Sequence, residues 1–182
     1  MALITLPSGV IPGEGLTDYV YGLVNQINAN ATLSGQPYSV LSYASTATLT
    51  ATSSTTLATA TGLTSTTLVA GGTYQISGML QGTAAASGGI KAALVASSGL
   101  TVTSLNVTGI NYNGTTINAQ TNVTALGSDF SSSSAVYTNL YFSGSFVVNA
   151  AGVLNVQAAQ NTSNASSTTV VIGSYFNLIR IS

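Results

Sequence analysis

The stretch that decides the fold is residues 139–160, NLYFSGSFVVNAAGVLNVQAAQ. Large apolar side chains alternate with polar or small ones in both halves. The apolar positions are Leu140, Phe142, Phe146 and Val148 in the first half, and Leu154, Val156 and Ala158 in the second. Because residues two apart in a strand share a face, each half predicts a strand with one buried face. The short turn at 150–152 between them predicts a β-hairpin.

The same alternation continues on both sides of this stretch. From Tyr38 onward Ser and Thr alternate with Val, Leu, Ile, Tyr and Phe, and Gly or Asn marks the turns. No helical period separates these segments, so the pattern predicts an all-β, antiparallel sandwich or barrel. The expected strands are 38–50, 54–61, 66–70, 73–84, 89–96, 101–109, 115–125, 136–149, 152–160 and 168–181.

The last expected strand is apolar on both faces, which predicts that both faces are covered. Val170, Ile172, Phe176 and Leu178 share one face, and Val171, Tyr175, Ile179 and Ile181 share the other. The second cover comes either from another subunit or from the chain's own loop or arm. We favour the subunit and predict an interface of Val171, Tyr175, Phe176, Ile179, Arg180 and Ile181. A buried Arg180 needs an acidic partner, for which Asp129, Glu14 and Asp18 are the candidates.

Residues 1–37 form a separate N-terminal segment, and residues 38–182 form the β domain. Apolar residues recur at helical spacing over about 16–32, and Gly35 and Pro37 end this predicted helix. The helix either packs on its own domain, or belongs to an anchoring arm or to a bundle with sister chains. The expected anchoring residues are Leu3, Ile4, Leu6, Val20, Leu23, Val24 and Ile27.

The chain is almost uncharged, which restricts its partners. Only 3% of its 182 residues are charged, where about 25% is usual. Clustered Lys and Arg attract nucleic acids and anionic membranes, so we expect neither partner here. A net charge of -1 also gives little colloidal repulsion and favours self-association. The first residues lack the basic start of a signal peptide, and no apolar stretch reaches the length of a membrane helix.

No catalytic or metal-binding constellation is recognisable in the sequence. Without His or Cys, nucleophile–base pairs built on either residue cannot form. Glu14 and Asp18 are the only close carboxyl pair, and both suit the start of the predicted helix. Asp129 reads as a turn residue and Lys91 as a solvated or paired charge. We therefore expect a protein without catalytic residues, metal or cofactor.

Several runs together resemble a known family of modules. These runs are 70–74 (AGGTY), 142–152 (FSGSFVVNAAG), 154–161 (LNVQAAQN) and 173–176 (GSYF). Their order is similar to trimeric jelly-roll modules, of tumour-necrosis-factor-like topology, in virion proteins of tailed bacteriophages. The resemblance covers about residues 38–182. It implies a jelly-roll sandwich whose last strand and its neighbours line a homotrimer core, and it carries no catalytic residues.

These observations predict a non-enzymatic structural protein on the virion surface. The first expectation is a trimeric capsid decoration, or cement, protein that binds the major capsid protein or another virion protein through its N-terminal arm. The alternative is the receptor- or glycan-binding tip of a head or tail fibre. In that role a hydroxyl- and amide-rich surface with nine tyrosines would hold a host surface glycan. A short chain without a fibrous repeat favours the first expectation.

Overall fold

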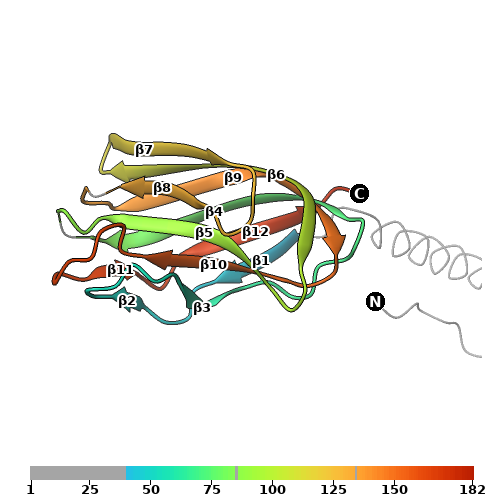
Figure 1. The fold of residues 1–182 in the computed structure, drawn as a ribbon, viewed down its shortest axis with the longest axis horizontal. Helices are drawn as coiled ribbons and strands as arrows, with labels where there is room; N and C mark the ends of the chain where they lie inside the picture. The colour runs from blue at the N-terminus through green and yellow to red at the C-terminus, as the bar shows by residue number, and fades with distance from the viewer. Residues whose placement is uncertain (1–39, 85, 134) are drawn as a thin grey trace, which may run out of the picture. The chain divides into compact units, whose positions relative to one another are not determined.

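The computed structural model describes residues 40–84, 86–133 and 135–182. Residues 40–182 form one compact unit, whose fold Figure 1 shows. The predicted helix at 16–32 and all seven expected anchoring residues lie outside the described residues. In the described part of the sequence, no helix has the length and apolar character needed to cross a bilayer.

The compact unit consists of two antiparallel sheets, which confirms the all-β prediction. The larger sheet has the strand order β1 (Val40–Ala44), β12 (Tyr175–Arg180), β4 (Thr73–Thr83), β9 (Asn139–Ala150), β6 (Thr101–Asn113) and β7 (Thr116–Val123). Two short strands, β2 (Leu49–Ala51) and β11 (Thr168–Val170), extend it beside β4. The smaller sheet has the order β3 (Ala58–Thr64), β10 (Val153–Ala159), β5 (Ile90–Ser97) and β8 (Asp129–Ser133).

The strand pairs are nested within one another in sequence order. β1 pairs with β12, β3 with β10, β4 with β9, and β5 with β8. The β6–β7 hairpin occupies the innermost position, between β5 and β8, and joins the larger sheet through β9. From β3 to β6, and again from β7 to β10, each strand lies in the opposite sheet from the strand before it. The polypeptide is therefore one long folded-back ribbon wrapped into two layers.

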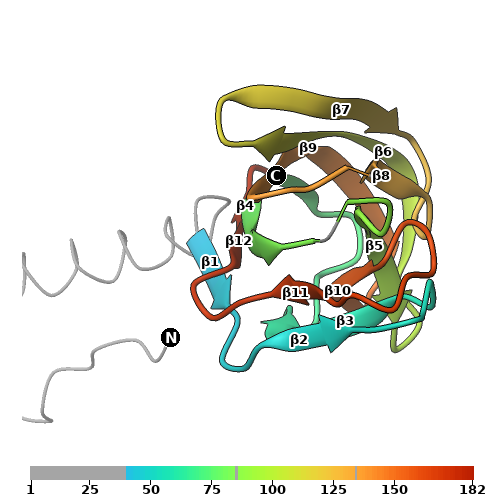
Figure 2. The same ribbon diagram turned by 90° about the vertical axis from the view of Figure 1, so that its left-hand side faces the viewer.

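The hydrophobic core fills the space between the two sheets. Figure 2, which looks along the strands, shows both layers curving around this interior. Three aromatic pairs lie in or beside it, with ring centroids 4.7 Å apart for Tyr43–Phe176, 5.5 Å for Tyr74–Phe146 and 5.3 Å for Phe130–Phe142. The seven apolar positions that decide the fold are all buried, as their alternation predicts: Leu140, Phe142, Phe146, Val148, Leu154, Val156 and Ala158.

The predicted hairpin of 139–160 is wrong, although the buried faces of its two strands are right. β9 belongs to the larger sheet and β10 to the smaller one, and no register joins them. The turn between them leads the backbone across the core. Leu154 and Phe146 therefore bury their side chains from opposite sides of the same interior. Alternation specifies which face is buried but not which strand lies alongside.

Other differences concern the strand boundaries. The expected strand at 38–50 is two strands, β1 and β2, and only the isolated bridge of Leu68 to Gly152 represents 66–70. The expected strand at 168–181 is divided into β11 and β12, because Gly173 has a φ of +100° that interrupts the extended backbone. No strand was expected where β8 lies, and Asp129 at its start was read as a turn residue. β8 is a strand because Phe130 enters the core, with 0% exposure.

Candidate functional site

The predicted interface residues lie on two different sides of β12. Tyr175 points outward from the larger sheet and is 38% exposed, and Ile179 lies half-buried on the same outer face. Val171 and Ile181 are also half-buried and lie just outside the two terminal strands. These four residues remain available at the surface of the described unit.

Phe176 does not belong with them. It is 0% exposed, stacks on Tyr43 and forms part of the core cluster. The chain's own fold therefore covers it completely, and no surface of Phe176 is left for another molecule to contact. The alternation correctly placed Phe176 on the same buried face as Leu178. Phe176 is therefore a core residue and not an interface residue.

Arg180 also has a different partner from those expected. Its Nε donates a hydrogen bond to the backbone oxygen of Ser182 at 2.7 Å. Asp129 instead forms an ion pair with Lys91, whose Nζ lies 3.2 Å from its Oδ2. Lys91 was expected to be solvated or paired, and it is paired. Asp129 is therefore the partner of Lys91 and not of Arg180. Glu14 and Asp18 lie outside the described residues.

An apolar row crosses the outer face of the larger sheet. The backbone register places Tyr175 opposite Met79, Met79 opposite Tyr141, and Tyr141 opposite Ile110. Directly opposed residues share a face and their side chains meet. We name Tyr175, Met79, Tyr141 and Ile110 the outer row. It runs across four neighbouring strands, β12, β4, β9 and β6.

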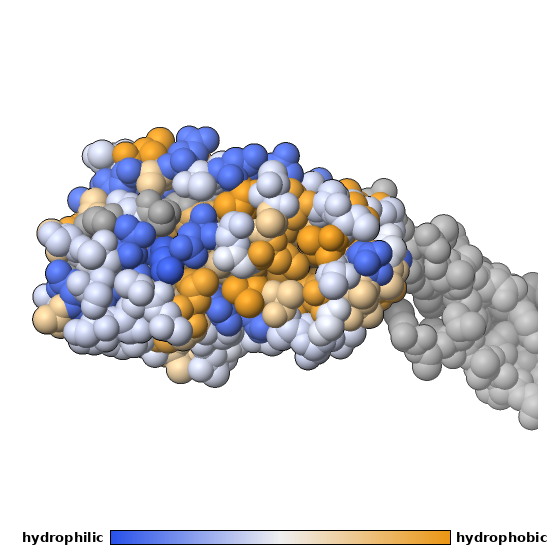
Figure 3. Space-filling model, viewed as in Figure 1, coloured by the Kyte–Doolittle hydropathy of each residue, from blue (hydrophilic) through white to orange (hydrophobic). Residues whose placement is uncertain are grey.

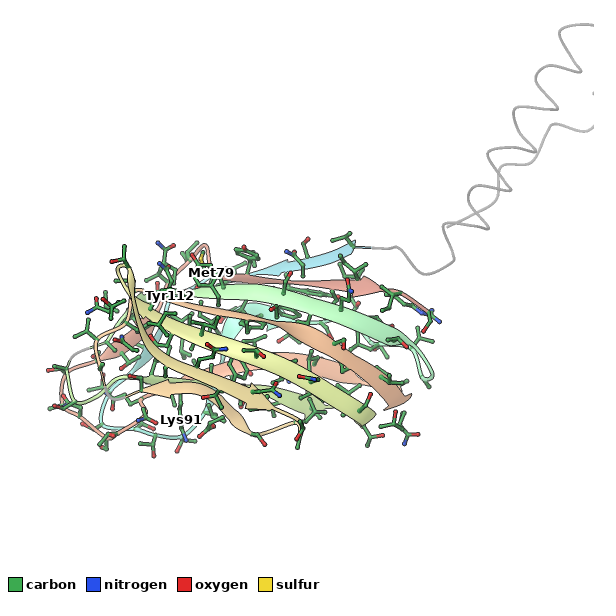
Figure 4. The ribbon with its side chains drawn as sticks, turned by 90° about the horizontal axis from the view of Figure 1, so that it is seen from above. Met79, Lys91 and Tyr112 are labelled. Atoms are coloured by element: carbon green, nitrogen blue, oxygen red, sulfur yellow. The ribbon has the colours of Figure 1, made fainter. Side chains whose placement is uncertain are left out.

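Aromatic contacts extend the outer row toward the tip of the β6–β7 hairpin. Tyr112 meets Tyr141 edge to face, with ring centroids 5.6 Å apart, and pairs in register with Ile117, which is 53% exposed. Figure 4 shows Met79 and Tyr112 on one side of the sandwich and Lys91 on the opposite side. The apolar outer face of the larger sheet therefore lies away from the Lys91–Asp129 ion pair.

Two shallow hollows lie beside the outer row and have Ser77 and Ser143 in common. The first has a volume of about 270 Å³ and is lined by Ser77, Gly78, Thr108, Ile110, Tyr141, Phe142, Ser143 and Tyr175. The second, of about 290 Å³, is lined by Gln75, Ile76, Ser77, Ser143, Gly144 and Ile179. Both exist because small outward side chains lie between large ones. Neither lining contains a Lys, Arg, Asp or Glu.

The outer face of the smaller sheet is more mixed. Figure 3 shows hydrophobic surface over β5 and β10 interrupted by hydrophilic patches. Val95 and Val153 are half-buried there. Cross-strand hydrogen bonds of 3.0 Å from Gln157 Nε2 to Thr59 Oγ1 and of 2.9 Å from Asn155 Nδ2 to Ser97 Oγ satisfy the amides. All of the large hydrophobic residues that are exposed in the described part of the molecule lie elsewhere: Val40, Val69, Ile117, Tyr141, Ile172 and Tyr175.

Among the described residues the charged side chains are Lys91, Asp129 and Arg180. Within 40–84, 86–133 and 135–182, no group of three or more acidic residues is placed to hold a metal ion. Burial raises the pKa of the Tyr137 phenol, whose hydroxyl donates to the carbonyl of Thr169. This phenol joins the segment before β9 to β11 inside the fold and has no access to a surface ligand.

The sequence anticipated part of this face. Tyr175 and Ile179 are predictable because they occupy the second apolar face of the last strand, and Tyr141 is predictable only as one of the outward residues of its strand. Met79, Ile110 and Tyr112 were missed. The expected strand at 101–109 ended before Ile110 and Tyr112, and only the register shows that Met79 and Ile110 lie in line with Tyr141 and Tyr175.

Comparison with known proteins gave no match to any protein-family model or to any curated protein. The function is therefore inferred from the geometry of this face.

Proposed function

We propose that this protein is a non-enzymatic virion structural protein that forms a homotrimer through the outer face of its larger sheet. We further propose that its fold is a jelly roll and that the trimer decorates a phage capsid. The arm at 1–37 would then bind the major capsid protein or another virion protein through Leu3, Ile4, Leu6 and the apolar residues of the predicted helix. Its place is the virion surface, without nucleic acid or membrane as a partner.

The nested strand order supports the jelly-roll proposal. A jelly roll is a double-sheet sandwich of eight strands in which a folded-back ribbon forms two Greek keys. Here the four nested pairs β1–β12, β3–β10, β4–β9 and β5–β8 supply eight strands, four in each layer. The β6–β7 hairpin is then an insertion at the innermost loop, and β2 and β11 are additions at one edge.

The observation that carries the association proposal is the outer row. Of its four residues, Tyr141 and Tyr175 are exposed and Met79 and Ile110 are half-buried. Apolar residues that lie side by side at a surface are typical of interaction sites, whereas single exposed ones are common everywhere. Full burial of one such residue contributes about 1.5–3 kcal/mol before the costs of association. The hollows beside the outer row contain no charged residue, so like charges would not repel one another when this face of one copy meets the same face of another.

A second function is supported by the first hollow. Tyr141 and Tyr175 stand beside it, and the hydroxyls of Ser77, Thr108 and Ser143 line it. Aromatic rings and hydroxyls in a site without charge suit a neutral sugar ring. In this alternative the protein is the glycan-binding tip of a fibre. It competes with the first proposal, because a face buried between subunits cannot receive a glycan.

The decisive experiment measures the mass of the full-length protein in solution, by light scattering or sedimentation, together with the variant Tyr141→Ser/Tyr175→Ser. We expect the unmodified protein to be a trimer and the double variant to be a monomer that keeps the β-sheet circular-dichroism spectrum and unfolds cooperatively, although at a lower temperature because the stabilisation from association is lost. Ile172→Ser is the matched control, since Ile172 is 62% exposed but lies outside the outer row, and it should remain trimeric. A monomeric unmodified protein, or a trimeric double variant, would overturn the association proposal.

Electron microscopy of the parent particle tests the location. Symmetric density at hundreds of copies over the shell supports decoration, whereas a few copies at a vertex or tail support the fibre tip. Titration of neutral mono- and oligosaccharides against the unmodified protein and Tyr141→Ser then tests the alternative directly. Saccharide binding that Tyr141→Ser abolishes would favour the glycan-binding function.

A further inference from the structure

The tip of the β6–β7 hairpin carries the only Asn-Gly dipeptide of the sequence, Asn113-Gly114. Asn113 ends β6, Thr116 begins β7, and the two residues pair across the loop Gly114-Thr115. Gly114 has a φ of +59°, whereas Thr115 has no positive φ. A positive φ at the first loop residue alone is the pattern of a type II′ turn. Asn113, Gly114 and Thr115 are all exposed.

We propose that Asn113 is a site of spontaneous deamidation, and that Thr138 restrains the reaction. The backbone nitrogen of Gly114 attacks Cγ of Asn113, and the new bond between these two atoms closes a five-membered succinimide. The bond between Cγ and Nδ2 of Asn113 breaks, and Nδ2 leaves as ammonia with the proton lost from the Gly114 nitrogen. Water then opens either carbonyl of the ring, which yields aspartate or isoaspartate. No oxidant or reductant takes part.

Glycine makes this nucleophile accessible, because it has no side chain to shield its nitrogen. A Cβ built at Gly114 would meet nothing within 4 Å. The space beside the Gly114 Cα is therefore empty, and the exposed tip is accessible to water.

Thr138 opposes the reaction from the neighbouring segment, just before β9. The Gly114 N–H donates to Thr138 Oγ1 at 3.0 Å. The hydroxyl of Thr138 in turn donates to the carbonyl of Tyr112 at 3.3 Å, and its backbone N–H donates to the same carbonyl at 2.8 Å. This clasp keeps the proton of the attacking nitrogen engaged in a hydrogen bond. Attack requires the hydrogen bond to break first.

Deamidation of Asn113 adds a negative charge close to Tyr112, which contacts Tyr141 of the outer row. Conversion of Asn113 to a carboxylate takes the formal net charge from -1 to -2, since one unit is added to the value for the whole sequence. Tyr112 and its register partner Ile117 are the adjacent apolar residues. Deamidation is thus a slow, irreversible change of a nearly uncharged surface.

Peptide mapping by mass spectrometry tests the proposal on the full-length protein, incubated at mildly alkaline pH. Asn113 should deamidate faster than any other Asn among the described residues. Thr138→Val should raise its rate about two- to tenfold, the factor that corresponds to the net free energy of one hydrogen bond. Thr138→Ser, which keeps the hydroxyl, should retain the original rate.

A second variant separates the clasp from general loosening of the hairpin. Asn118 Nδ2 donates to the carbonyl of Val136 at 2.6 Å and also ties the hairpin to the segment before β9, without touching Gly114. Asn118→Ala should leave the rate at Asn113 unchanged. Equal acceleration by Asn118→Ala, or no acceleration by Thr138→Val, would overturn the role of Thr138. An Asn113 that reacts no faster than other asparagines would overturn the site itself.

Discussion

Tyr43 and Phe176 are register partners on β1 and β12, and their rings stack with centroids 4.7 Å apart. The Tyr43 hydroxyl lies 2.9 Å from Thr66 Oγ1 and accepts the Thr66 N–H at 3.0 Å. Thr66 follows β3 in the sequence, so this one tyrosine ties the edge of the larger sheet to the smaller layer. The pair closes the core where its first and last strands meet.

Truncation of the Phe176 or Tyr43 side chain should lower the free energy of unfolding. Phe176→Ala should lower the free energy of unfolding by about 3–5 kcal/mol, the usual cost of removing a buried aromatic ring. Tyr43→Phe keeps the stack and loses only the hydroxyl bonds, so about 0.5–1.5 kcal/mol is expected. Urea denaturation of the full-length protein measures both. Ile172→Ala, at an exposed position, is the control, and a loss at Phe176 no larger than at Ile172 would contradict this account.

Gly78 is required by the close approach of the Phe142 ring. A Cβ at this position would overlap that ring and lie 2.7 Å from the carbonyl oxygen of Tyr175. We expect Gly78→Ala to destabilise the fold by about 1–3 kcal/mol, as overpacked core positions do. Thermal unfolding should show the loss, whereas Ser77→Ala on the exposed neighbouring position should change little. A variant as stable as the unmodified protein would mean that the ring moves aside without penalty.

The buried Tyr137 phenol predicts a loss of stability at alkaline pH. Burial raises its pKa in the folded state above the ordinary value of about 10. Above that pH the unfolded protein releases this proton while the folded protein keeps it, so the contribution to stability is complete below about pH 10 and falls as the pH rises further. Tyr137→Phe should make the alkaline decline of the unfolding free energy shallower. An alkaline decline that Tyr137→Phe leaves unchanged would show that another group causes it.

The Lys91–Asp129 ion pair should contribute little to stability. The two side chains are 19% and 36% exposed, and pairs of this kind are worth about 0–1 kcal/mol. Asp129→Asn should therefore shift the unfolding free energy by no more than that amount at low salt, and by less at high salt. A loss of several kcal/mol that persists in concentrated salt would show that the pair braces β5 against β8 more strongly than its exposure allows.

Association through the outer row should respond to salt as a hydrophobic contact does. The hollows beside the row contain no acidic or basic residue, so screening has no attraction to weaken. Salts excluded from protein surfaces strengthen apolar burial. We expect the dissociation constant measured by sedimentation to fall as ammonium sulfate is added. Dissociation of the trimer by moderate sodium chloride would indicate an ionic interface instead.

The sequence predicted the layers of this fold better than its connections. Period-two alternation identified the buried residues of β9 and β10 because each apolar residue gains free energy from burial whatever strand lies beside it. The same signal cannot distinguish a hairpin from a crossover. The turn at 150–152 was therefore assigned to a hairpin, while the backbone in fact passes between sheets.

The candidate site was predictable only where one strand carried the whole signal. Tyr175 and Ile179 were predicted because they are apolar residues on the second face of β12. Met79 and Ile110 lie on β4 and β6, and only the pairing register places them in a line with Tyr175. Phe130 was missed because the serines around it show no apolar alternation. The strand β8 has a single buried ring, that of Phe130.

The nested order of the strands predicts the order in which the protein folds. The β6–β7 hairpin joins neighbours across a two-residue loop, whereas each pair farther out closes a longer loop around the one before it. Loop closure costs more entropy as the loop lengthens, and long-range pairing slows folding. Folding should therefore propagate from the centre of the sequence outward, and docking of β1 onto β12 completes it. The outer row itself needs β12, which pairs with β4 late in this order, so we expect the monomer to be largely folded before copies associate.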